Sequence, residues 1–246
     1  MIEFKNVSKT FGDQTVITEE RFTINSGEFF VLVGPSGGGK TTTLKMINRL
    51  VEPSSGRILL DGRDISSMPL RQLRLTIGYV LQQIALFPNM TVGQNIELIP
   101  EMKGWPKDKR ARRAKELLTT VGLDADSYYK RYPQELSGGE QQRVGILRAL
   151  VANPELILMD EPFSALDPIT RAQLQDLTLD LHDKLKTTVV FVTHDIDEAC
   201  YMGDRICVIS DGEVTQIGSP KEIKGHPANQ FVADLFSHNH KRKDRD

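Results

Sequence analysis

Apolar and polar positions divide the chain into segments that favour strands and segments that favour helices. Over residues 1–32 the two kinds of residue alternate, as at Ile2, Phe4 and Val7, and an unbroken apolar run, FFVLV, begins at Phe29. Alternation is typical of a half-buried strand, and a short apolar run between turn residues is typical of a buried one. We therefore expect residues 1–32 to form β-structure.

The following segments switch between the alternating pattern of strands and the helical pattern of apolar residues. We expect a helix over Lys40–Leu50, a strand with an Asp-Gly turn over Arg57–Ile65, and mainly helices from about residue 86 to 154. In this last region one helical face is apolar, and Gly122 suits the end of that helix. The apolar face is formed by Ala111, Ala114, Leu117, Leu118 and Val121.

Three further apolar runs follow in the second half of the chain. They begin at Leu156 (LILM), Thr188 (TVVFV) and Ile206 (ICVIS), and helical stretches separate them. Strands that alternate with helices indicate a largely parallel sheet with helices on its faces. The pair Asp211 and Gly212 then predicts a late hairpin.

Composition narrows the possible functions. The chain has 246 residues, of which 39% are hydrophobic and 26% are charged, and its 31 basic and 33 acidic residues give a formal net charge of -2. A nucleic-acid-binding protein is usually basic, so we expect no nucleic-acid partner. Neither Cys200 nor Cys207 has a Cys or His at the spacing of a metal site, and both fit reduced thiols in a cytosolic compartment.

The sequence shows no segment of its own that would enter a membrane. No apolar run approaches the ~20 residues that cross a bilayer, and the start, MIEFKNVSKTF, lacks the apolar core of a signal peptide. We expect a soluble chain that another protein must bring to any membrane. The basic stretch Lys107–Lys115 predicts a solvated helix face, with contact to anionic lipid as the alternative, and residues 237–246 predict a flexible tail.

A glycine-rich segment is the first candidate for chemistry. Residues 34–42, GPSGGGKTT, match the pattern G-x-x-x-x-G-K-[ST] between a predicted strand and a predicted helix. Glycines let backbone N–H groups curl around phosphate oxygens, Lys40 can reach the β- and γ-phosphates, and the Thr41 hydroxyl can bind Mg²⁺. The expected phosphate-binding residues are Gly34, Pro35, Ser36, Gly37, Gly38, Gly39, Lys40, Thr41 and Thr42.

Polar residues at the ends of two later strands are candidates for catalysis. Asp160 and Glu161 follow the run LILM, and His194 follows the run that starts at Thr188. The carboxyl edge of a parallel sheet is where such sheets bind ligands. We expect Asp160 on the side of the Mg²⁺ ion, Glu161 to polarise the attacking water and His194 to face the phosphate. The alternatives are a helix-capping acid and a structural histidine.

The segment Leu136–Arg143, LSGGEQQR, supports two compatible interpretations. Ser137 and Glu140 have the spacing of a capping box at the start of a helix. A helix start with two glycines is also an anion site. Because residues 34–42 already supply a complete phosphate loop, a second anion site predicts that a second chain contributes half of each nucleotide site.

In this order the motifs resemble those of the ATP-binding subunits of ABC transporters, over essentially the whole chain. Gly34–Thr42 resembles the Walker A loop, Leu156–Glu161 the Walker B motif and Leu136–Glu140 the family signature, whose last position is commonly Gln rather than Glu140. The resemblance assigns further positions: the Q-loop to Gln82, the D-loop to Ser164–Asp167, the switch histidine to His194 and the aromatic residue under adenine to Phe11.

The resemblance implies an α/β fold, the P-loop NTPase cassette. It has a RecA-like mixed-sheet core, an N-terminal antiparallel β subdomain and an inserted α-helical subdomain, here about residues 86–154 of an ATPase domain spanning residues 1–236. The implied catalytic residues are Glu161, His194 and Gln82, and the implied Mg²⁺ ligands are Thr41, Gln82 and Asp160. The implied nucleotide contacts outside the phosphate loop are Phe11, Ser137, Gly138, Gly139, Glu140 and Asp167.

The resemblance also implies partners. Two cassettes would close head to tail on two ATP molecules, each held between the Walker A loop of one chain and Ser137, Gly138 and Gly139 of the other. Integral membrane permease subunits would dock near the Q-loop, which places the chain at the cytoplasmic face of the membrane as a peripheral subunit. A solute-binding protein would complete an importer, which the absence of fused membrane spans favours over an exporter.

A narrower resemblance concerns the transported solute. The segments KMINRL from Lys45, QQIALFP from Gln82 and RYPQELS from Arg131 are similar to those of importers of quaternary amines such as glycine betaine, carnitine and choline. Many relatives carry C-terminal domains of the cystathionine-β-synthase type. The ten residues after Phe236 are too short for them, so we expect either that this member lacks them or that the chain has been shortened. The alternatives are an ATPase subunit for another small polar solute, or an ATPase of this family outside transport, such as one for DNA repair.

Overall fold

The computed structural model describes residues 1–237, and the chain divides into two compact units. One unit combines Met1–Leu73 with the chain from Thr188 onward, and the other is Arg74–Thr187. The tail expected at residues 237–246 lies outside the described residues except for Ser237, which is the last residue of a helix. Within the described part of the chain, no helix is both long and apolar enough to cross a membrane.

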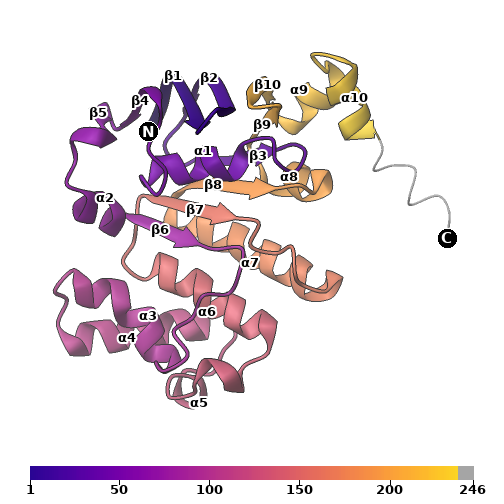
Figure 1. Ribbon diagram of the computed structural model, residues 1–246. Coiled ribbons are helices and arrows are strands. Elements are labelled where there is room, and N and C mark those ends of the chain that lie inside the picture. The colour runs from indigo at the N-terminus through magenta and orange to yellow at the C-terminus, as the bar shows by residue number, and fades with distance from the viewer. Residues whose placement is uncertain (238–246) are drawn as a thin grey trace, which may run out of the picture. The chain divides into compact units, whose positions relative to one another are not determined.

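An antiparallel sheet forms the start of the first unit (Figure 1). Its strands, in the order β2-β1-β4-β5, are β1 (Ile2–Phe11), β2 (Gln14–Ile24), β4 (Ser55–Leu60) and β5 (Arg63–Asp64). The apolar positions that predict these strands are buried, and the rings of Phe4 and Phe22 stack at 4.4 Å. β4 and β5 form the predicted hairpin, with Asp61 and Gly62 at its turn.

A mixed sheet in the same unit supports the glycine-rich loop. Its strands, in the order β10-β9-β3-β8, are β3 (Phe29–Val33), β8 (Thr188–Thr193), β9 (Arg205–Ser210) and β10 (Glu213–Gly218). β3 runs parallel to β8 and β9, and β10 closes the predicted hairpin with β9. Every residue of β3 and β8 is buried, because α1 (Lys40–Ile47) packs on β8 and α8 (Ile196–Met202) on both strands.

The helix predicted over Lys40–Leu50 ends earlier, at Ile47. Arg49 takes a left-handed conformation with φ 55°, which no helix continues through, and its guanidinium donates to the carbonyl of Met68 at 2.9 Å. The remaining helices of this unit are η1 (Ile65–Ser67), α9 (Pro220–Gly225) and α10 (Gln230–Ser237), and α2 (Leu70–Thr76) contains the boundary with the second unit.

The second unit is mainly helical around a pair of parallel strands, β6 (Ile77–Val80) and β7 (Leu156–Asp160). Its helices are α3 (Val92–Met102), α4 (Lys107–Thr120), α5 (Ala125–Tyr128), η2 (Pro133–Glu135), α6 (Gly138–Leu150) and α7 (Pro168–Leu185). α6 packs closely on β6, since a Cβ atom at Gly78 would lie 2.6 Å from the carbonyl oxygen of Ala149. α3 to α6 occupy the region in which the sequence predicts helices.

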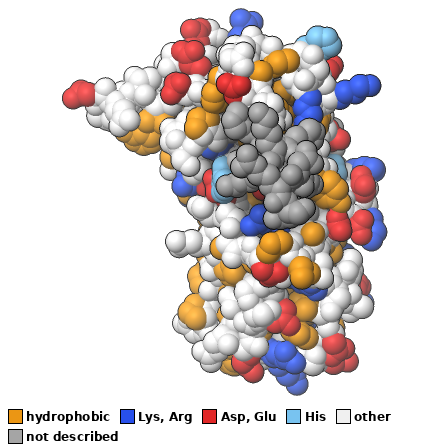
Figure 2. All heavy atoms as spheres, turned by 90° about the vertical axis from the view of Figure 1, so that its right-hand side faces the viewer, with side chains coloured by type: hydrophobic (Ala, Val, Ile, Leu, Met, Phe, Trp, Pro, Cys, Tyr) orange, Lys and Arg blue, Asp and Glu red, His pale blue; other side chains and the backbone are white. Residues whose placement is uncertain are grey.

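The basic stretch forms most of α4. Ala114, Leu117 and Leu118 are buried as predicted, while Lys107, Lys109 and Arg112 are exposed, which agrees with a solvated face. Acidic and basic side chains are mixed over the face seen in Figure 2, in line with the nearly balanced charge. Cys207 is buried, Cys200 is half-buried, and neither is in a disulfide.

Candidate nucleotide site

The glycine-rich loop connects β3 to α1, and two of its glycines adopt backbone conformations that would strain any other residue. Gly34 has φ 149°, and a Cβ atom there would lie 1.9 Å from the carbonyl oxygen of Ile209 on β9. Gly39 has φ 103°, and a Cβ atom there would lie 3.2 Å from the carbonyl oxygen of Val16 on β2. The loop therefore lies against the backbone of two strands: the contact at Gly34 leaves no room for a side chain, and the one at Gly39 favours glycine.

The side chain of Lys40 folds back against the carbonyl groups of this loop. Its amine lies 2.8 Å from the carbonyl oxygens of both Gly34 and Pro35, and the side chain is buried. Pro35, Ser36 and Gly37, at the crest of the loop, are exposed. The loop thus holds the Lys40 amine below an exposed stretch of backbone. This arrangement is suited to binding an anion with several oxygens.

The start of α1 adds to this positive potential. Gly39 precedes the helix, no side chain caps it, and its first turn contains no acidic residue. Thr41 and Thr42 lie half-buried in this turn. Helix N–H groups that no side chain caps, together with the helix dipole, form an anion-binding site.

Two other predicted residues belong to the same unit. In the sheet Val33 pairs with Thr193, so Gly34 and His194 leave neighbouring strands at the same edge, where His194 is exposed. Phe11 ends β1 with its side chain 48% exposed, and the Lys9 amine lies 4.6 Å from the centre of its ring. The structure therefore brings His194 to the edge from which the phosphate loop starts, and leaves the ring of Phe11 open to contact.

The second unit contains the predicted carboxylates. Asp160 ends β7 and is only 5% exposed, and Glu161 follows it with an unusual positive φ of 42°. The amide nitrogen of Gln82, just beyond β6, donates to a carboxylate oxygen of Glu161 at 3.4 Å. The parallel pairing of β6 and β7 thus brings Gln82 and Glu161 together, although 79 positions separate them.

Tyr79 on β6 is a neighbour of these acids that the sequence did not point to. Burial first, and the charge of Asp160 second, raise the pKa of Tyr79 above its ordinary value. Its hydroxyl is buried and has no hydrogen-bond partner in the described structure. No pattern in the sequence distinguishes this tyrosine, because its position depends on how β6 pairs with β7.

The capping box predicted at Ser137 and Glu140 is confirmed at the start of α6. The Ser137 hydroxyl accepts from the Glu140 N–H at 3.3 Å, and the Glu140 carboxylate accepts from the Ser137 N–H at 2.7 Å and from its hydroxyl at 2.8 Å. The other carboxylate oxygen accepts from the hydroxyl of Tyr128, whose ring packs 4.1 Å from the guanidinium of Arg131. Sequence reasoning missed Tyr128, since nothing in its spacing marks it.

The electrostatics of this helix start follow from those bonds. The hydrogen bond from Tyr128 first, and those from Ser137 next, hold the pKa of Glu140 below its ordinary value. Ser137 and Gly138 are exposed, and a Cβ atom at Gly138 would meet no atom within 4 Å, whereas one at Gly139 would lie 2.6 Å from Thr170. The segment is thus a capped, exposed helix start that carries a carboxylate.

Asp167 caps a second helix of this unit. Its carboxylate accepts from the N–H groups of Ile169 at 3.1 Å and Thr170 at 3.0 Å, and its bond with Thr170 lowers the pKa of Asp167. Upstream, the Ser164 hydroxyl donates to the carbonyl of Glu161 at 3.0 Å. The segment after Glu161 is therefore fixed by local hydrogen bonds up to the start of α7.

The fold and the loop define a class. A phosphate loop that follows a buried parallel strand and opens a helix, in a mixed α/β structure, is characteristic of P-loop nucleotide-binding proteins. The ABC transporter family matches residues 17–164, which is more than half of the chain. The chain belongs to the ABC transporter family.

Curated relatives extend this result. The chain is 54% identical to the glycine betaine/carnitine/choline transport ATP-binding protein OpuCA of Bacillus subtilis, over 96% of the chain and 62% of the relative. It is 50% identical to the osmoprotectant import ATP-binding protein OsmV of Salmonella typhimurium, over 96% of the chain and 63% of the relative. The chain therefore spans less than two thirds of the length of these relatives.

Solved structures show the same fold. The ATP-binding cassette MJ0796, in a dimeric post-hydrolysis state bound to ADP and Pi, has a TM-score of 0.79 at 36% identity, over 89% of this chain and 99% of that one. The protein cbiO1 of Clostridium perfringens, part of the ABC transporter complex cbiONQ, has a TM-score of 0.84 at 26% identity, over 100% of this chain and 98% of that one. The P-loop cassette fold expected from the sequence is confirmed.

Proposed function

We propose that the chain is the ATP-hydrolysing subunit of a membrane importer for a quaternary amine. The observation that carries the proposal is the phosphate loop: Gly34 and Gly39 let it pack on two strands, Lys40 is held inside it, and α1 starts without a side-chain cap. Such a loop binds a triphosphate through backbone N–H groups and a lysine.

The residues of this chain act on ATP by position and charge rather than by covalent chemistry. Lys40 binds the β- and γ-phosphates. Glu161 orients and polarises the attacking water, and Gln82, which reaches Glu161, responds to the γ-phosphate. His194 contacts the γ-phosphate from the edge of the sheet, and Phe11 stacks on the adenine ring.

The donor atoms that the chain offers fit a magnesium ion. Thr41 supplies a hydroxyl, Asp160 a carboxylate and Gln82 an amide oxygen, which are hard oxygen ligands of the kind that Mg²⁺ prefers. Mg²⁺ binds through few protein ligands and keeps several waters, so we propose these three residues as its protein ligands. When bound, the ion neutralises charge on the β- and γ-phosphates.

A second copy of the chain completes each nucleotide site in this proposal. Ser137, Gly138 and Gly139, at the exposed start of α6, contact the ATP held by the phosphate loop of the other copy, with Glu140 and Asp167 beside them. Exposure of Ser137 and Gly138 supports this role, since their groups are open to a ligand from outside the chain. Dimeric structures of the related cassette MJ0796 also support it.

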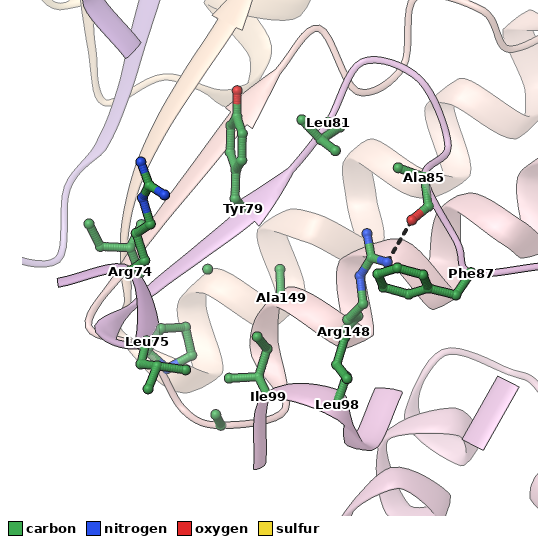
Figure 3. Close-up of a pocket in the computed structure, with 14 residues that line it drawn as sticks. Arg74, Leu75, Tyr79, Leu81, Ala85, Phe87, Leu98, Ile99, Arg148 and Ala149 are labelled. Atoms are coloured by element: carbon green, nitrogen blue, oxygen red, sulfur yellow. Dashed lines mark hydrogen bonds between the residues drawn. The ribbon is translucent and has the colours of Figure 1, made fainter. Parts of the chain in front are cut away.

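A groove in the second unit supports docking of a permease subunit. It has a volume of about 380 Å³ and is lined mainly by apolar side chains of β6, α3, α6 and the segment after Gln82 (Figure 3). Arg148 donates to the carbonyl of Ala85 at 2.7 Å and lies 6.0 Å from the ring of Phe87, which is 46% exposed. We assign this groove to a short amphipathic segment of an integral membrane subunit, and assign about residues 86–154 to a helical subdomain of an ATPase domain covering residues 1–236.

The solute and the location are assigned by relationship. The relatives named above are described as transport proteins for glycine betaine, carnitine and choline or for osmoprotectants. Selection of the solute would belong to the permease and a solute-binding protein, because the groups described here all serve the nucleotide or a partner. We place the chain at the cytoplasmic face of the membrane, bound to the permease.

Replacement of Glu161 tests the proposal. Glu161→Gln keeps the shape of the side chain and removes its basic carboxylate, so ATP binding should be retained and turnover should fall at least about 10²-fold. Glu155→Gln is the matched control, because Glu155 is an exposed acid at the other end of β7. ATP hydrolysis by the purified chain, and ATP-driven uptake of labelled glycine betaine by vesicles holding the assembled importer, are the measurements. Near-normal hydrolysis by Glu161→Gln would contradict the proposed role of Glu161. Uptake of a different solute, without uptake of glycine betaine, would contradict the assignment of a quaternary amine as the transported solute.

A further inference from the structure

A carboxyl group is buried behind the phosphate loop. Glu20, on β2, is only 1% exposed, although glutamate is almost never fully buried without a charged partner. Its Oε1 atom accepts a hydrogen bond from the Thr43 hydroxyl at 2.7 Å, and its Oε2 atom has no hydrogen-bond partner in the described structure. Thr43 lies in the first turn of α1, directly after the phosphate-binding residues. Glu20 therefore connects the antiparallel sheet to the helix that opens the nucleotide site.

Thr43 has one hydroxyl proton and two acceptors for it. Besides Glu20, the carbonyl oxygen of Gly39 lies 3.2 Å from the hydroxyl, and this carbonyl also accepts the N–H of Thr43 at 2.8 Å. An ionised Glu20 draws the hydroxyl proton to itself. A protonated Glu20 can instead donate to the Thr43 oxygen, which releases the hydroxyl proton to Gly39. The protonation state of Glu20 thus changes the hydrogen bonding of Gly39, the last glycine of the phosphate loop.

We propose that Glu20 is a positioning residue of the nucleotide site, and that the hydrogen bonds Glu20–Thr43–Gly39 couple the binding of ATP to the uptake of a proton by Glu20. The inference rests on the proposed function, since it requires that the loop binds a triphosphate. ATP brings negative charge to the start of the helix that Glu20 contacts, and a like charge disfavours the ionised form of a carboxyl group. Binding therefore favours the protonated form.

The free protein is suited to this coupling at neutral pH. Burial raises the pKa of Glu20 to about 7, and the hydrogen bond from Thr43 opposes the rise. Near pH 7 both forms of Glu20 are therefore populated, so ATP can shift the balance between them. As the pH rises through about 7 the ionised form becomes dominant, and the affinity for ATP falls.

Other charged or titratable groups lie on the elements around Glu20. On β1 the residue opposite it is Val7, and on α1 the amine of Lys40 is held by two loop carbonyls. On β9, burial first and Glu20 second raise the pKa of the Cys207 thiol, and Arg205 pairs with Glu28 at 2.9 Å. The remaining charged groups on these elements are Glu3, Lys5 and Lys9 on β1, Glu19 and Arg21 on β2 itself, Lys45 on α1 and Glu213 on β10. Ordinary amines, guanidinium groups and carboxyls titrate well away from pH 7, whereas histidine side chains ordinarily titrate near it. His194 is present in both the wild type and Glu20→Gln, so the part of a transition that this variant removes is assigned to Glu20.

The test compares ATP hydrolysis by the full chain and by Glu20→Gln between about pH 6 and about pH 8.5, a range that brackets the Glu20 transition. Glutamine is neutral and can donate to Thr43 as the protonated acid does. In the wild type the KM for ATP should rise about tenfold across this range, with a smaller change in kcat. In Glu20→Gln this rise in KM should be clearly smaller, and what remains belongs to ATP itself and to groups that both proteins share. Glu213→Gln, an exposed acid on β10, is the control and should follow the wild type.

Calorimetry and variants of Thr43 test the same coupling independently of the KM measurement. Calorimetry of ATP binding near pH 7, in two buffers with different ionisation enthalpies, should show proton uptake by the wild type and less by Glu20→Gln. If Glu20→Gln fails to fold, Thr43 gives a second pair of variants: Thr43→Val breaks the hydrogen-bond chain, so the rise in KM with pH should become smaller, and Thr43→Ser, which retains the hydroxyl, should keep the rise.

The outcomes separate this inference from the proposed function. ATP binding with the same pH profile in wild type and Glu20→Gln would overturn the inference alone, as would an unchanged rise in KM with pH in Thr43→Val. A wild-type chain that binds no ATP at any pH would overturn the proposed function and the inference together.

Discussion

The N-termini of α1 and α6 differ in how their unpaired N–H groups are capped. Every helix start leaves N–H groups without partners inside the helix. At α1 the preceding residue is Gly39, no side chain caps the helix, and the first turn has no acid. At α6 Ser137 and Glu140 form a reciprocal capping box, and Glu140 is an acid in the first turn. The first helix start is left open for an anion, and the second carries its own.

The difference is compatible with the proposal that each chain supplies two unequal parts, one to each of two nucleotide sites. At α1, Lys40 and the loop backbone supply positive potential before any ligand arrives. At α6 the lowered pKa of Glu140 keeps a negative charge beside the exposed groups of Ser137 and Gly138. An anion therefore has reason to bind at α1, whereas the charge of Glu140 disfavours independent binding of an anion at the start of α6.

The most drastic way to test this comparison is to destroy one helix start in each of two chains. Lys40→Ala removes the cation at α1, and Ser137→Arg blocks the start of α6, so each variant alone should lose at least about 10²-fold in ATP turnover. A mixture should recover activity in part, because a heterodimer combines the intact Lys40 of one chain with the intact Ser137 of the other. Steady-state hydrolysis against the mixing ratio is the measurement. No recovery, once heterodimers have been demonstrated, would contradict sites built from two chains.

A milder test adds one methyl group at each helix start. Gly39→Ala forces an alanine to φ 103° against the carbonyl of Val16, so we expect about 1–3 kcal/mol of lost stability and a clear loss of ATP affinity. Gly138→Ala meets no atom within 4 Å and replaces glycine inside a helix, so the free energy of unfolding should stay the same or rise by up to about 1 kcal/mol. Chemical unfolding and ATP titrations of both variants measure this. Equal effects would mean that the two helix starts do not differ in the way described.

The contrast also marks what the sequence could reveal. The glycine, lysine and capping-box positions have fixed spacings, so both helix starts, the strand before α1 and the acids at residues 160 and 161 were predictable. β6 was not, because Ile77–Val80 is short and its neighbours show no clear period. Glu20 and Tyr128 were not either, since their roles come from packing: one is buried against Thr43, and the other reaches Glu140 from a different helix.

The smallest expected effect concerns the hydrogen bond from the Tyr128 hydroxyl to Glu140, the acid in the first turn of α6. Tyr128→Phe removes only the hydroxyl that donates to Glu140 and keeps the ring that packs against Arg131. Loss of one partly exposed hydrogen bond to a charged acceptor should lower the free energy of unfolding by about 1 kcal/mol. Because the folded protein holds the pKa of Glu140 below its ordinary value of 4.5, this contribution is present at neutral pH and disappears as the pH falls below that value.

A double-mutant cycle with Glu140→Gln makes that last prediction specific. If Tyr128 acts through the charge of Glu140, its removal should cost clearly less when residue 140 is a neutral amide, because charge-assisted hydrogen bonds are about twice as strong as neutral ones. Urea unfolding of the four proteins at neutral pH gives the coupling energy. Additive effects would show that Tyr128 stabilises α5 by packing alone. A positive coupling would show that the acid at the start of α6 is held in place by Tyr128, whereas the open start of α1 depends on the backbone of Gly39.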